Sequence, residues 1–580
     1  MKRSVRIANA SGFLGDRGSA LLEMVTGGDI DFVTGDYLAE VTMLILGRQF
    51  MKDPTTGYAK AFLHHLEPAF SEVLKRGVKV VVNAGGLNPR GLASAVTALA
   101  GKLGLSPKVA TVEGDNLRPR IDQLIAEGNL FQNLESGKPL DPRLLFTANA
   151  YLGAWGIVQA LEAGADIVIC PRVTDASLVV GPAAFWHGWK RDDWDALAGA
   201  VVAGHIIECG AQATGGNYSS FREVADMRKP GFPLAEVDHD GSSVITKHEG
   251  TGGAVTVGTV TAQLVYEIQG SKYLNPDVTT DLGSVHLEQL GKDRVRTSGV
   301  KGSPPSPSTK VAITTAGGFV NEMTFVFTGL EVDAKMSMFE EAARAAFGDL
   351  PAKIEFQRIG AGKENPVSEN ESCSFLRVLA SSRDEAAVGR TFSSALIELG
   401  LASYPGLFAI APPATGHPVG RFWPALIPQR LVEHTVTLPD GSTVPVALPP
   451  VMHDVAVDPT ARESTVLPSS PTRRVPLGTL VDARSGDKGS DANLGLWVRS
   501  DAAFEWLRHT VSVDRLKMLV PEAASLEISR TVLPNLRALN FVIRGLLSGG
   551  AAATMRFDRQ AKALGEFVRA RHVEIPVSLL

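Results

Sequence analysis

Cysteine is scarce in this chain, which has only Cys170, Cys209 and Cys373 among its 580 residues. Three cysteines cannot form the disulfide framework of a small secreted domain, so we expect a protein of the reducing cytosol. No run approaches the roughly 18 apolar residues of a membrane helix. The N-terminal residues also lack the apolar core of a secretory signal. Together these absences predict a cytoplasmic protein without a membrane partner.

Several familiar cofactor and catalytic motifs are missing as well. No CxxC, HExxH or clustered His and Cys spacing is present, and we predict no metal site. The glycine-rich segment NASGFLGDRG at residues 9–18 does not match the GxGxxG of a dinucleotide site, and we predict no separate cofactor. The lack of a G-x-S-x-G motif argues against an α/β-hydrolase.

Negatively charged residues outnumber positively charged ones over the whole chain, and the net charge is −5. This value argues against nucleic acid or an anionic membrane as a partner. The charge is uneven, because residues 471–580 carry 16 Lys and Arg against 11 Asp and Glu. A basic tail indicates an anionic ligand there, although small domains also differ in charge by chance.

Apolar patterning predicts an α/β fold class with three regions. Over residues 1–230, short apolar runs alternate with helical stretches, which is typical of a parallel sheet buried on both faces. The pattern does not distinguish an open sheet from a barrel. Residues 231–470 are rich in Val, Thr and Gly and predict a β-rich middle region. A linker is predicted at residues 467–474 (LPSSPTRR), followed by a small α+β domain at residues 475–580.

Polar and ionisable residues follow nearly every predicted strand of the first region. Loops at the carboxyl ends of parallel strands converge, and ligands bind there. These loops supply Asp16, Arg17, Asp36, Glu40, Asn83, Gly85, Gly86, Asp115, Asn149, Arg172 and Asp175. Because Asp and Asn are also common helix caps, any one of these residues can be structural. As a set they predict a binding or catalytic site.

Two later segments add candidates. In GHIIECGAQATGGN, Glu208 lies between apolar residues and a glycine-rich loop, where a raised pKa would suit proton transfer. His205 and Cys209 share a helix face there, and we favour a buried His and a structural Cys over a metal pair. In EGTGGAVT, ahead of a predicted β run, the N–H groups of Gly252 and Gly253 could line an anion site or form a tight bend.

The stretch ARSGDKGSDANLG at residues 483–495 lies between two predicted strands and is longer than a plain hairpin turn. Two interpretations stay open. The segment could be a long loop locked by its own Asp and Asn turns. Alternatively, it could bind an anion in the C-terminal domain, away from the catalytic centre, through Arg484 and Lys488 braced by Asp487 and Asn493.

Nine motifs occur in an order that resembles the AtuA family of acyclic terpene utilisation proteins. They are GFLGDR, DFVTGDYLAEVTM, DPTTGYAKAFL, VVVNAGGLNP, PRVTDASLVVGP, HIIECGAQATGG, GFPLAEV, GTGGAVT and ARSGDKGSDANLG. Residues from about 4 to 470 are similar to the family's large N-terminal region. Residues from about 475 to 575 are similar to its C-terminal domain, which is described as ferredoxin-like.

The resemblance implies a role in the breakdown of citronellol- and geraniol-type acids as branched acyl-CoA thioesters. It implies a hydro-lyase, hydratase or C–C lyase acting on a 3-hydroxyacyl-CoA, with coenzyme A as part of the substrate. The resemblance assigns no residue roles, so the candidates rest on the sequence. We expect Asp36, Glu40, Asp175 and Glu208 to act in acid/base catalysis. We expect the substrate to be bound by Asp16, Arg17, Asn83, Gly85, Gly86, Asn149, Arg172, Gly252, Gly253, Arg484, Asp487, Lys488 and Asn493.

A different class of function is also compatible with the sequence. The chain could be a non-catalytic binding or assembly subunit of an acyl-CoA carboxylase system, since the resemblance places such carboxylases beside the family. A hydrolase of thioesters or lactones is a third, weaker alternative. We also expect a homo-oligomer.

Overall fold

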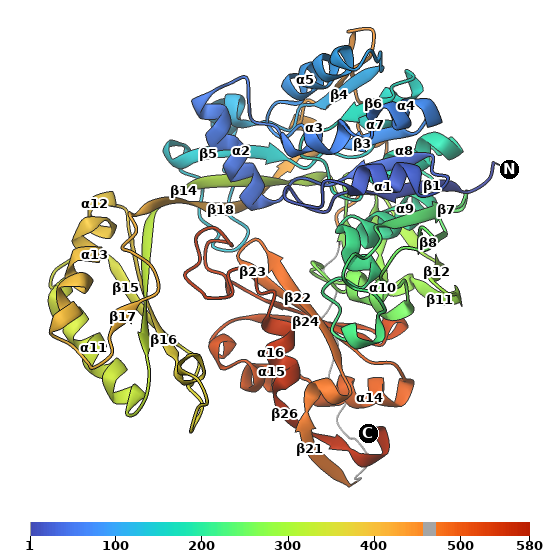
Figure 1. Ribbon diagram of the computed structural model, residues 1–580. Helices are drawn as coiled ribbons and strands as arrows, with labels where there is room; N and C mark the ends of the chain where they lie inside the picture. Colours follow the sequence, from blue (N-terminus) through green and yellow to red (C-terminus); the bar gives the residue numbers. More distant parts are fainter. Residues whose placement is uncertain (1, 456–470) are drawn as a thin grey trace. The chain divides into compact units, whose positions relative to one another are not determined.

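The structure is a computed structural model that describes residues 2–455 and 471–580. It forms two compact units, one made of Met1–Thr314 with Phe422–Leu580 and the other of Thr315–Arg421 (Figure 1). The changes of composition at residues 230 and 470 do not coincide with the edges of these units. Residues 231–314 pack with the N-terminal region because their strands extend its sheet.

An open sheet of 11 strands is the framework of the larger unit, in the order β11-β12-β8-β7-β1-β2-β3-β6-β4-β19-β20. Its centre, β1-β2-β3-β6-β4, is parallel, and the strands on either side are antiparallel. The sheet is therefore open and not a barrel. The bounds are β1 Val5–Asn9, β2 Phe32–Gly35, β3 Lys79–Val82, β4 Val109–Glu113, β6 Ile167–Ile169, β7 Pro233–Val237, β8 Ser243–Lys247, β11 His286–Gly291, β12 Arg294–Ser298, β19 Thr435–Thr437 and β20 Thr443–Pro445.

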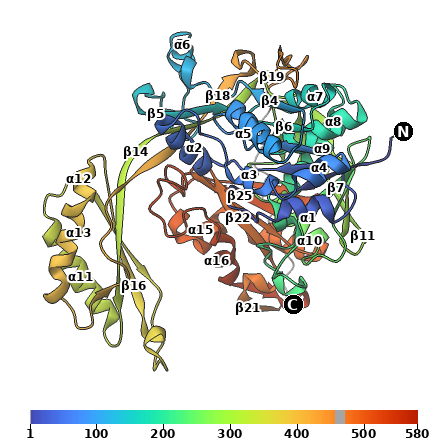
Figure 2. The same ribbon diagram turned by 45° about the horizontal axis from the view of Figure 1, so that its top comes forward.

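Helices cover both faces of the parallel strands, as the apolar runs predict. On β3, Val81 packs into one core, whereas Val80 and Val82 pack into the other. Helices α1, α4 and α5 lie on one side, and α7, α8 and α9 lie on the other (Figures 1 and 2). Their bounds are α1 Ala20–Thr26, α4 Phe70–Arg76, α5 Pro89–Lys102, α7 Trp155–Glu162, α8 Ser177–His187 and α9 Trp194–Ile207. The remaining helices of the N-terminal half are α2 Glu40–Lys52, α3 Ala61–Leu66 and α6 Ile121–Ala126.

One predicted strand of the parallel sheet belongs elsewhere. Strand β5 (Leu145–Ala150) pairs with β14 (Ser308–Phe327) and not with β4 or β6. The N–H of Tyr151, just after β5, donates to the carbonyl of Lys310 at 2.9 Å. The prediction was wrong because an apolar run does not specify its partner strand.

The β run expected after EGTGGAVT is instead helix α10 (Val257–Leu264). Thr256 Oγ1 accepts from Thr259 N at 3.2 Å, and Thr259 Oγ1 accepts from Thr256 N at 3.0 Å. This reciprocal capping starts a helix even though the segment is rich in β-branched residues. A small antiparallel sheet follows, made of β9 Lys272–Leu274, β10 Thr279–Asp281 and β13 Lys301–Ser303.

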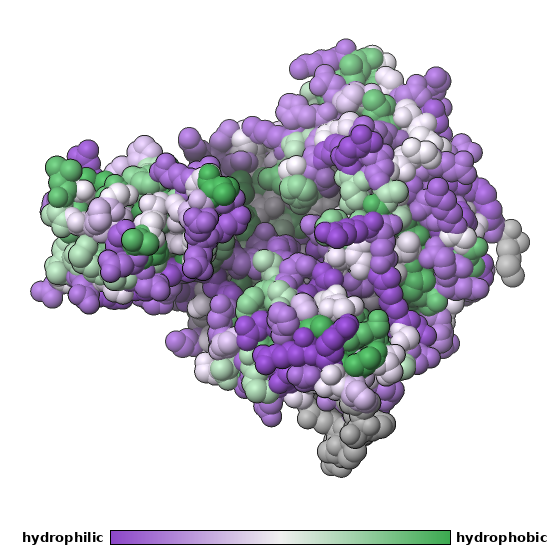
Figure 3. All heavy atoms as spheres, turned by 60° about the horizontal axis from the view of Figure 1, so that its bottom comes forward, coloured by the Kyte–Doolittle hydropathy of each residue, from purple (hydrophilic) through white to green (hydrophobic). Residues whose placement is uncertain are grey.

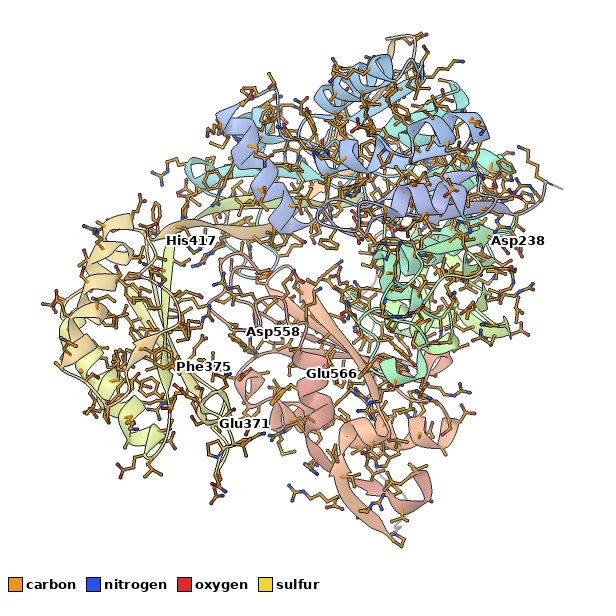
Figure 4. The ribbon with its side chains drawn as sticks, viewed as in Figure 1. Asp238, Glu371, Phe375, His417, Asp558 and Glu566 are labelled. Atoms are coloured by element: carbon orange, nitrogen blue, oxygen red, sulfur yellow. The ribbon has the colours of Figure 1, made fainter. Side chains whose placement is uncertain are left out.

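The smaller unit, Thr315–Arg421, has an antiparallel sheet with helices packed against it. Its core is aromatic, with Phe325, Phe339 and Phe392 all buried. Figure 4 labels Glu371, Phe375 and His417 on this unit. The elements are β15 Lys353–Ile359, β16 Ser374–Ser382, β17 Phe408–Ala409, α11 Val332–Phe347, α12 Glu385–Val388 and α13 Arg390–Ile397, together with parts of β14 and of β18 His417–Pro428.

The C-terminal domain is an antiparallel sheet, β22-β23-β25-β24, packed against helices, which confirms the predicted α+β class. Its elements are β22 Asp482–Lys488, β23 Asp491–Trp497, β24 Ile528–Leu533, β25 Ala538–Ile543, α14 Asp501–Thr510, α15 Val513–Leu519 and α16 Leu564–Ala570. Residues 467–470 of the predicted linker lie outside the described residues. Its remaining part falls in β21 (Thr472–Pro476), which pairs with β26 (His572–Pro576).

Polar side chains cover most of the face in Figure 3, and apolar residues there form separate patches. Within residues 2–455 and 471–580, we find no helix that combines the length and the apolar character needed to cross a membrane.

The stretch ARSGDKGSDANLG is a β-hairpin, so the prediction of a long loop was wrong. Strands β22 and β23 pair along their full length, and only Gly489 and Ser490 form the turn. Gly489 has a φ of +70°, which favours glycine. Gly495 has another reason to be glycine, because a Cβ there would lie 2.6 Å from Val265 Cβ. The hairpin therefore packs directly against the segment after α10.

We predict that Gly495→Ala destabilises the protein by about 1–3 kcal/mol, since an added methyl group must displace buried Val265. Urea unfolding measures the change. Gly101→Ala in α5 is the matched control, because a Cβ there meets no atom within 4 Å. Alanine at that helical position is neutral or stabilising. Equal stability of the two variants would contradict the close packing of hairpin and segment.

Candidate active site

A cluster of ionisable side chains lies beyond the carboxyl ends of β2, β3 and β6, where the loops of the parallel strands converge. Its members influence one another electrostatically and come from both the N-terminal region and the C-terminal hairpin. They are Asp36, Glu40, Tyr151, Arg172, Asp175, His205, Glu208, Glu267, Tyr273, Lys310, Asp487 and Lys488. All of them belong to the larger unit.

Asp36 follows β2 directly and is fixed by its neighbours. Its Oδ1 accepts hydrogen bonds from Asn83 Nδ2 at 2.6 Å and from Leu38 N at 3.1 Å. Asn83 follows β3, and its Oδ1 accepts from Tyr37 N at 2.7 Å. Asn83 therefore locks the loops of two adjacent strands together and holds the Asp36 carboxyl at the sheet edge.

Arg172, in the loop after β6, is buried at the centre of the cluster. Its Nη1 donates to Leu38 O at 2.6 Å, and its Nη2 donates to the Tyr151 hydroxyl at 2.9 Å. The guanidinium also lies 4.4 Å from the centre of the Tyr151 ring. Asp175 Oδ1 is 3.4 Å from Nη1 and completes an ion pair.

Glu208 follows the last turn of α9 and is buried. Its Oε1 lies 3.2 Å from His205 Nδ1. Its Oε2 is buried without a hydrogen-bond partner among the described residues. The His205 ring is 4.9 Å from the ring of Tyr273, on β9. One Glu208 oxygen is thus free to exchange a proton with a bound molecule.

Asp36, Asp175 and Glu208, here called the carboxylate group, repel one another. Burial raises the pKa of Asp36 well above its ordinary value, and the charge of Asp175 raises it further. Burial likewise raises the pKa of Glu208, again with Asp175. Arg172 opposes both shifts without cancelling them. The neutral forms of Asp36 and Glu208 are therefore favoured more than those of ordinary carboxyls.

The cluster also carries three positively charged side chains, Arg172, Lys310 and Lys488, here called the cationic group. Burial favours the neutral form of Glu40, but these three positive charges outweigh it and lower the Glu40 pKa. Lys310 Nζ lies 5.3 Å from the centre of the Tyr151 ring. Among the described residues no hydrogen-bond acceptor or ion-pair partner contacts Lys310 or Lys488.

A second layer supports this edge through Asp115, in the loop after β4. Asp115 Oδ2 accepts from Asn149 Nδ2 at 2.7 Å and from Arg172 N at 3.2 Å. Burial, only partly offset by these bonds, raises the pKa of Asp115 to about 7. Asn149 therefore acts on Arg172 through Asp115 and not directly on the cluster.

Asp115 makes stability depend on pH, since its pKa is higher in the folded chain than in the unfolded chain. The stabilising effect of its proton is complete below about pH 4 and is lost as the pH rises towards 7. We predict that the stability of the wild type relative to Asp115→Asn falls by about 2–3 kcal/mol between pH 5 and pH 8. Denaturant titrations of both proteins measure this difference. Parallel pH curves would contradict the shifted pKa.

Two predicted binding residues, Asp16 and Arg17, are engaged away from the cluster. Asp16 Oδ2 accepts from Gly12 N at 2.8 Å and closes the loop after β1. Arg17 Nη2 donates to Glu23 Oε2 at 2.9 Å and to Pro230 O at 3.0 Å. These contacts stabilise the loop after β1. Both residues therefore have a structural role, which is the other interpretation of polar residues at strand ends.

Three of the four predicted glycine donors are likewise engaged. Gly85 N donates to Cys170 O at 3.0 Å, and Gly86 N donates to Asn83 O at 3.3 Å. Gly253 N donates to Ala225 O at 3.1 Å. A Cβ at Gly252 would meet backbone oxygens of its neighbours. The structure therefore favours the tight bend for EGTGGAVT over an anion site.

The predicted binding residues of the hairpin differ in whether their side chains belong to the cluster. Arg484 is buried, stacks 4.3 Å from the Tyr266 ring centre, and donates to Gln212 Oε1 and to Asn217 O. Asp487 and Lys488 end β22 and extend into the cluster. The expectation that this segment lies away from the candidate catalytic residues was therefore wrong, because the hairpin places Lys488 near Glu40 and Tyr273.

Several members of the cluster were not predicted from the sequence. Tyr151, Glu267, Tyr273 and Lys310 stand in ordinary strand or loop sequences without a motif. Tyr151 follows β5, Glu267 follows α10, Tyr273 is on β9 and Lys310 is on β14, so only the tertiary fold brings these residues together. In the described parts of the chain, no group of three or more His, Cys, Asp or Glu side chains that could hold a metal ion is found.

Comparison with protein families gives two matches. The model described as "Acyclic terpene utilisation family protein AtuA" matches residues 5–438, and the one described as "AtuA ferredoxin-like domain" matches residues 475–574. Searches of curated proteins and of solved structures returned no significant match. The first match includes every cluster residue of the N-terminal region, and the second includes the hairpin that carries Asp487 and Lys488.

Proposed function

The chain belongs to the AtuA family of acyclic terpene utilisation proteins, and on this premise we propose that it is a hydro-lyase or C–C lyase. Its substrate is a 3-hydroxyacyl-CoA thioester of a branched or terpenoid acid. One observation carries the proposal: the buried carboxyls of Asp36 and Glu208, whose pKa values are raised well above the ordinary value, belong to the same cluster as the buried cationic Arg172.

Proton transfer is the task of the carboxylate group. Three carboxyls in mutual repulsion do not all ionise together, so a proton acceptor and a proton donor stand side by side near neutral pH. Asp36 and Glu208 have raised pKa values, which makes their ionised forms stronger bases than ordinary carboxylates. The unpaired Glu208 Oε2 supplies an oxygen that can reach the substrate.

The cationic group stabilises negative charge. Removing the proton next to a thioester carbonyl places charge on the carbonyl oxygen, and positive side chains fixed in a site of low polarity lower the energy of that state. Lys310 and Lys488 have no acceptor among the described residues, which supports a role in binding an anionic oxygen of the substrate. These cations keep Glu40 ionised, and its negative charge partly compensates the positive charge of the cationic group.

Dehydration and C–C cleavage both follow from this chemistry. In dehydration, an ionised carboxylate takes the proton from the carbon beside the thioester carbonyl, and a neutral carboxyl protonates the departing 3-hydroxyl. Water and the enoyl thioester are the products. In cleavage, the base takes the hydroxyl proton, the bond between the second and third carbons breaks, and the acid protonates the released enolate.

We predict that Asp36→Asn and Glu208→Gln each lower kcat/KM by 10²- to 10⁴-fold on a branched 3-hydroxyacyl-CoA, because each removes an acid/base group. Stopped assays that separate enoyl-CoA from cleavage products measure both reactions. Asp166→Asn is the matched control: this carboxylate precedes the same strand β6 at the opposite edge of the sheet and pairs with Lys79 at 2.7 Å.

Full activity in both cluster variants would exclude their acid/base role. If the wild type neither turns over these thioesters nor binds them, but co-purifies with acyl-CoA carboxylase subunits, the alternative of an assembly subunit is supported.

Lys488→Ala and Arg484→Ala should have different effects. We predict that Lys488→Ala weakens acyl-CoA binding at least tenfold with little change in melting temperature, because the Lys488 side chain contacts no acceptor within residues 2–455 and 471–580. Arg484→Ala should mainly lower the melting temperature, since Arg484 joins the hairpin to Gln212 and Asn217. Isothermal titration and thermal melting of both variants check this. Unchanged binding by Lys488→Ala would remove the lysine from the site.

A further inference from the structure

Glu267, just after α10, has a strained backbone. Its φ is +57°, in the left-handed region that non-glycine residues rarely adopt. Such strain persists only where the surroundings enforce it, and it concentrates at functional sites. The Glu267 side chain belongs to the ionisable cluster, where its charge acts on Glu208 and Lys488.

Two buried asparagines of the C-terminal sheet enforce this conformation. Asn493 Oδ1 accepts the N–H of Glu267 at 2.7 Å, and Asn493 Nδ2 donates to Ile268 O at 3.2 Å. Asn540 Nδ2 donates to the same carbonyl at 3.3 Å. Asn493 is on β23 and Asn540 is on β25. The C-terminal domain thus determines the conformation of Glu267.

One lysine joins Glu267 to Asp487. Lys562 Nζ lies 3.8 Å from Glu267 Oε1 and 3.5 Å from Asp487 Oδ1. The lysine also contacts the Tyr266 hydroxyl. Two carboxylates therefore share one ammonium group at the end of the hairpin.

The backbone that carries Lys562 is strained and held in a similar way. The preceding Ala561 has a φ of +52°, and its carbonyl accepts from Ser485 Oγ at 2.6 Å. Asp558 Oδ1 accepts the N–H of Lys562 at 2.9 Å. Figure 4 labels Asp558, together with Glu566 further along the same segment. Strain at Ala561, next to the lysine, and at Glu267, its ion-pair partner, indicates that the fold keeps this group in place against local preference.

The electrostatics of the group favour the protonated form of Asp487. Burial and the charges of Glu267 and Glu40, opposed by Lys562, together raise the pKa of Asp487 to about 7. Lys488 is the next residue on β22. The other groups on which the charge of Glu267 acts are His205, Glu208, Cys209, Tyr266 and Tyr273, and Arg484 lies over the Tyr266 ring.

We propose that Glu267 and Asp487, joined by Lys562, form a second acid/base pair of this site, with Asn493 as the positioning residue of Glu267. The pair rests on the function proposed above. In the dehydration step, neutral Asp487 takes the role of the acid in place of a member of the carboxylate group and donates its proton to the 3-hydroxyl, which leaves as water. The carboxylate group takes the proton from the neighbouring carbon, and the Glu267 charge keeps Asp487 protonated at neutral pH.

Carboxyl ¹³C NMR of protein labelled at aspartate tests the pair without any substrate, with the Asp487 signal assigned by Asp487→Asn. We expect a wild-type midpoint near pH 7 and a lower midpoint in Glu267→Gln, because a negative neighbour is removed. Asn493→Ala should shift the midpoint the same way, since Glu267 is then released. If Asn493→Ala does not fold, Glu267→Gln still tests the pair, because glutamine has nearly the same shape as glutamate.

Glu566→Gln is the matched control, because Glu566 lies near Lys562 in the chain but pairs with Arg569 at 2.8 Å. It should leave the Asp487 midpoint unchanged. With substrate, the limb of the kcat/KM pH profile near pH 7 should move to lower pH in Glu267→Gln, and Asp487→Asn should lose at least tenfold in kcat.

An Asp487 midpoint that does not respond to Glu267→Gln overturns the proposal, whether or not the protein turns over acyl thioesters. A midpoint that shifts in a protein without such turnover contradicts the function proposed above and supports the carboxylate pair.

Discussion

The guanidinium of Arg172 lies out of water at the carboxyl edge of the parallel strands, where an unpaired charge would cost several kcal/mol. The Leu38 carbonyl, the Tyr151 hydroxyl and Asp175 offset that cost. These partners come from three different loops, so the charge can be buried only when the loops meet. The site and the edge of the sheet therefore form together.

The carboxyl groups of the cluster have pKa values that are shifted in opposite directions. Asp36 and Glu208, next to Asp175, have raised pKa values, whereas Glu40, facing Lys310 and Lys488, has a lowered one. The same residue type thus takes different protonation states within one site because its neighbours differ. This separation is what allows proton transfer and the binding of an anionic oxygen to occur side by side.

Much of the framework and part of the site followed from sequence patterns. Apolar runs without alternation indicated strands buried on both faces, and β3 with its two cores confirms this. Polar residues after β2 and β6 indicated Asp36, Arg172 and Asp175 as neighbours, because parallel strands end at one edge. The same pattern failed for Asp16 and Arg17, since a polar residue at a strand end satisfies its own loop as readily as a ligand.

Most strands and helices of the N-terminal region, the α+β C-terminal domain and the carboxylates at the strand ends could be predicted from the sequence, because these depend on local periodicity and on the geometry of parallel strands. The predicted β run after EGTGGAVT missed a local signal, the reciprocal capping of Thr256 and Thr259 that starts α10. The tertiary structure, by contrast, decided that β5 leaves the parallel sheet. It also decided that the hairpin carries Lys488 and Asp487 into the cluster. These features depend on contacts between segments far apart in the chain, such as Gly495 against Val265. A pattern of residue types does not specify which distant segment a residue will meet.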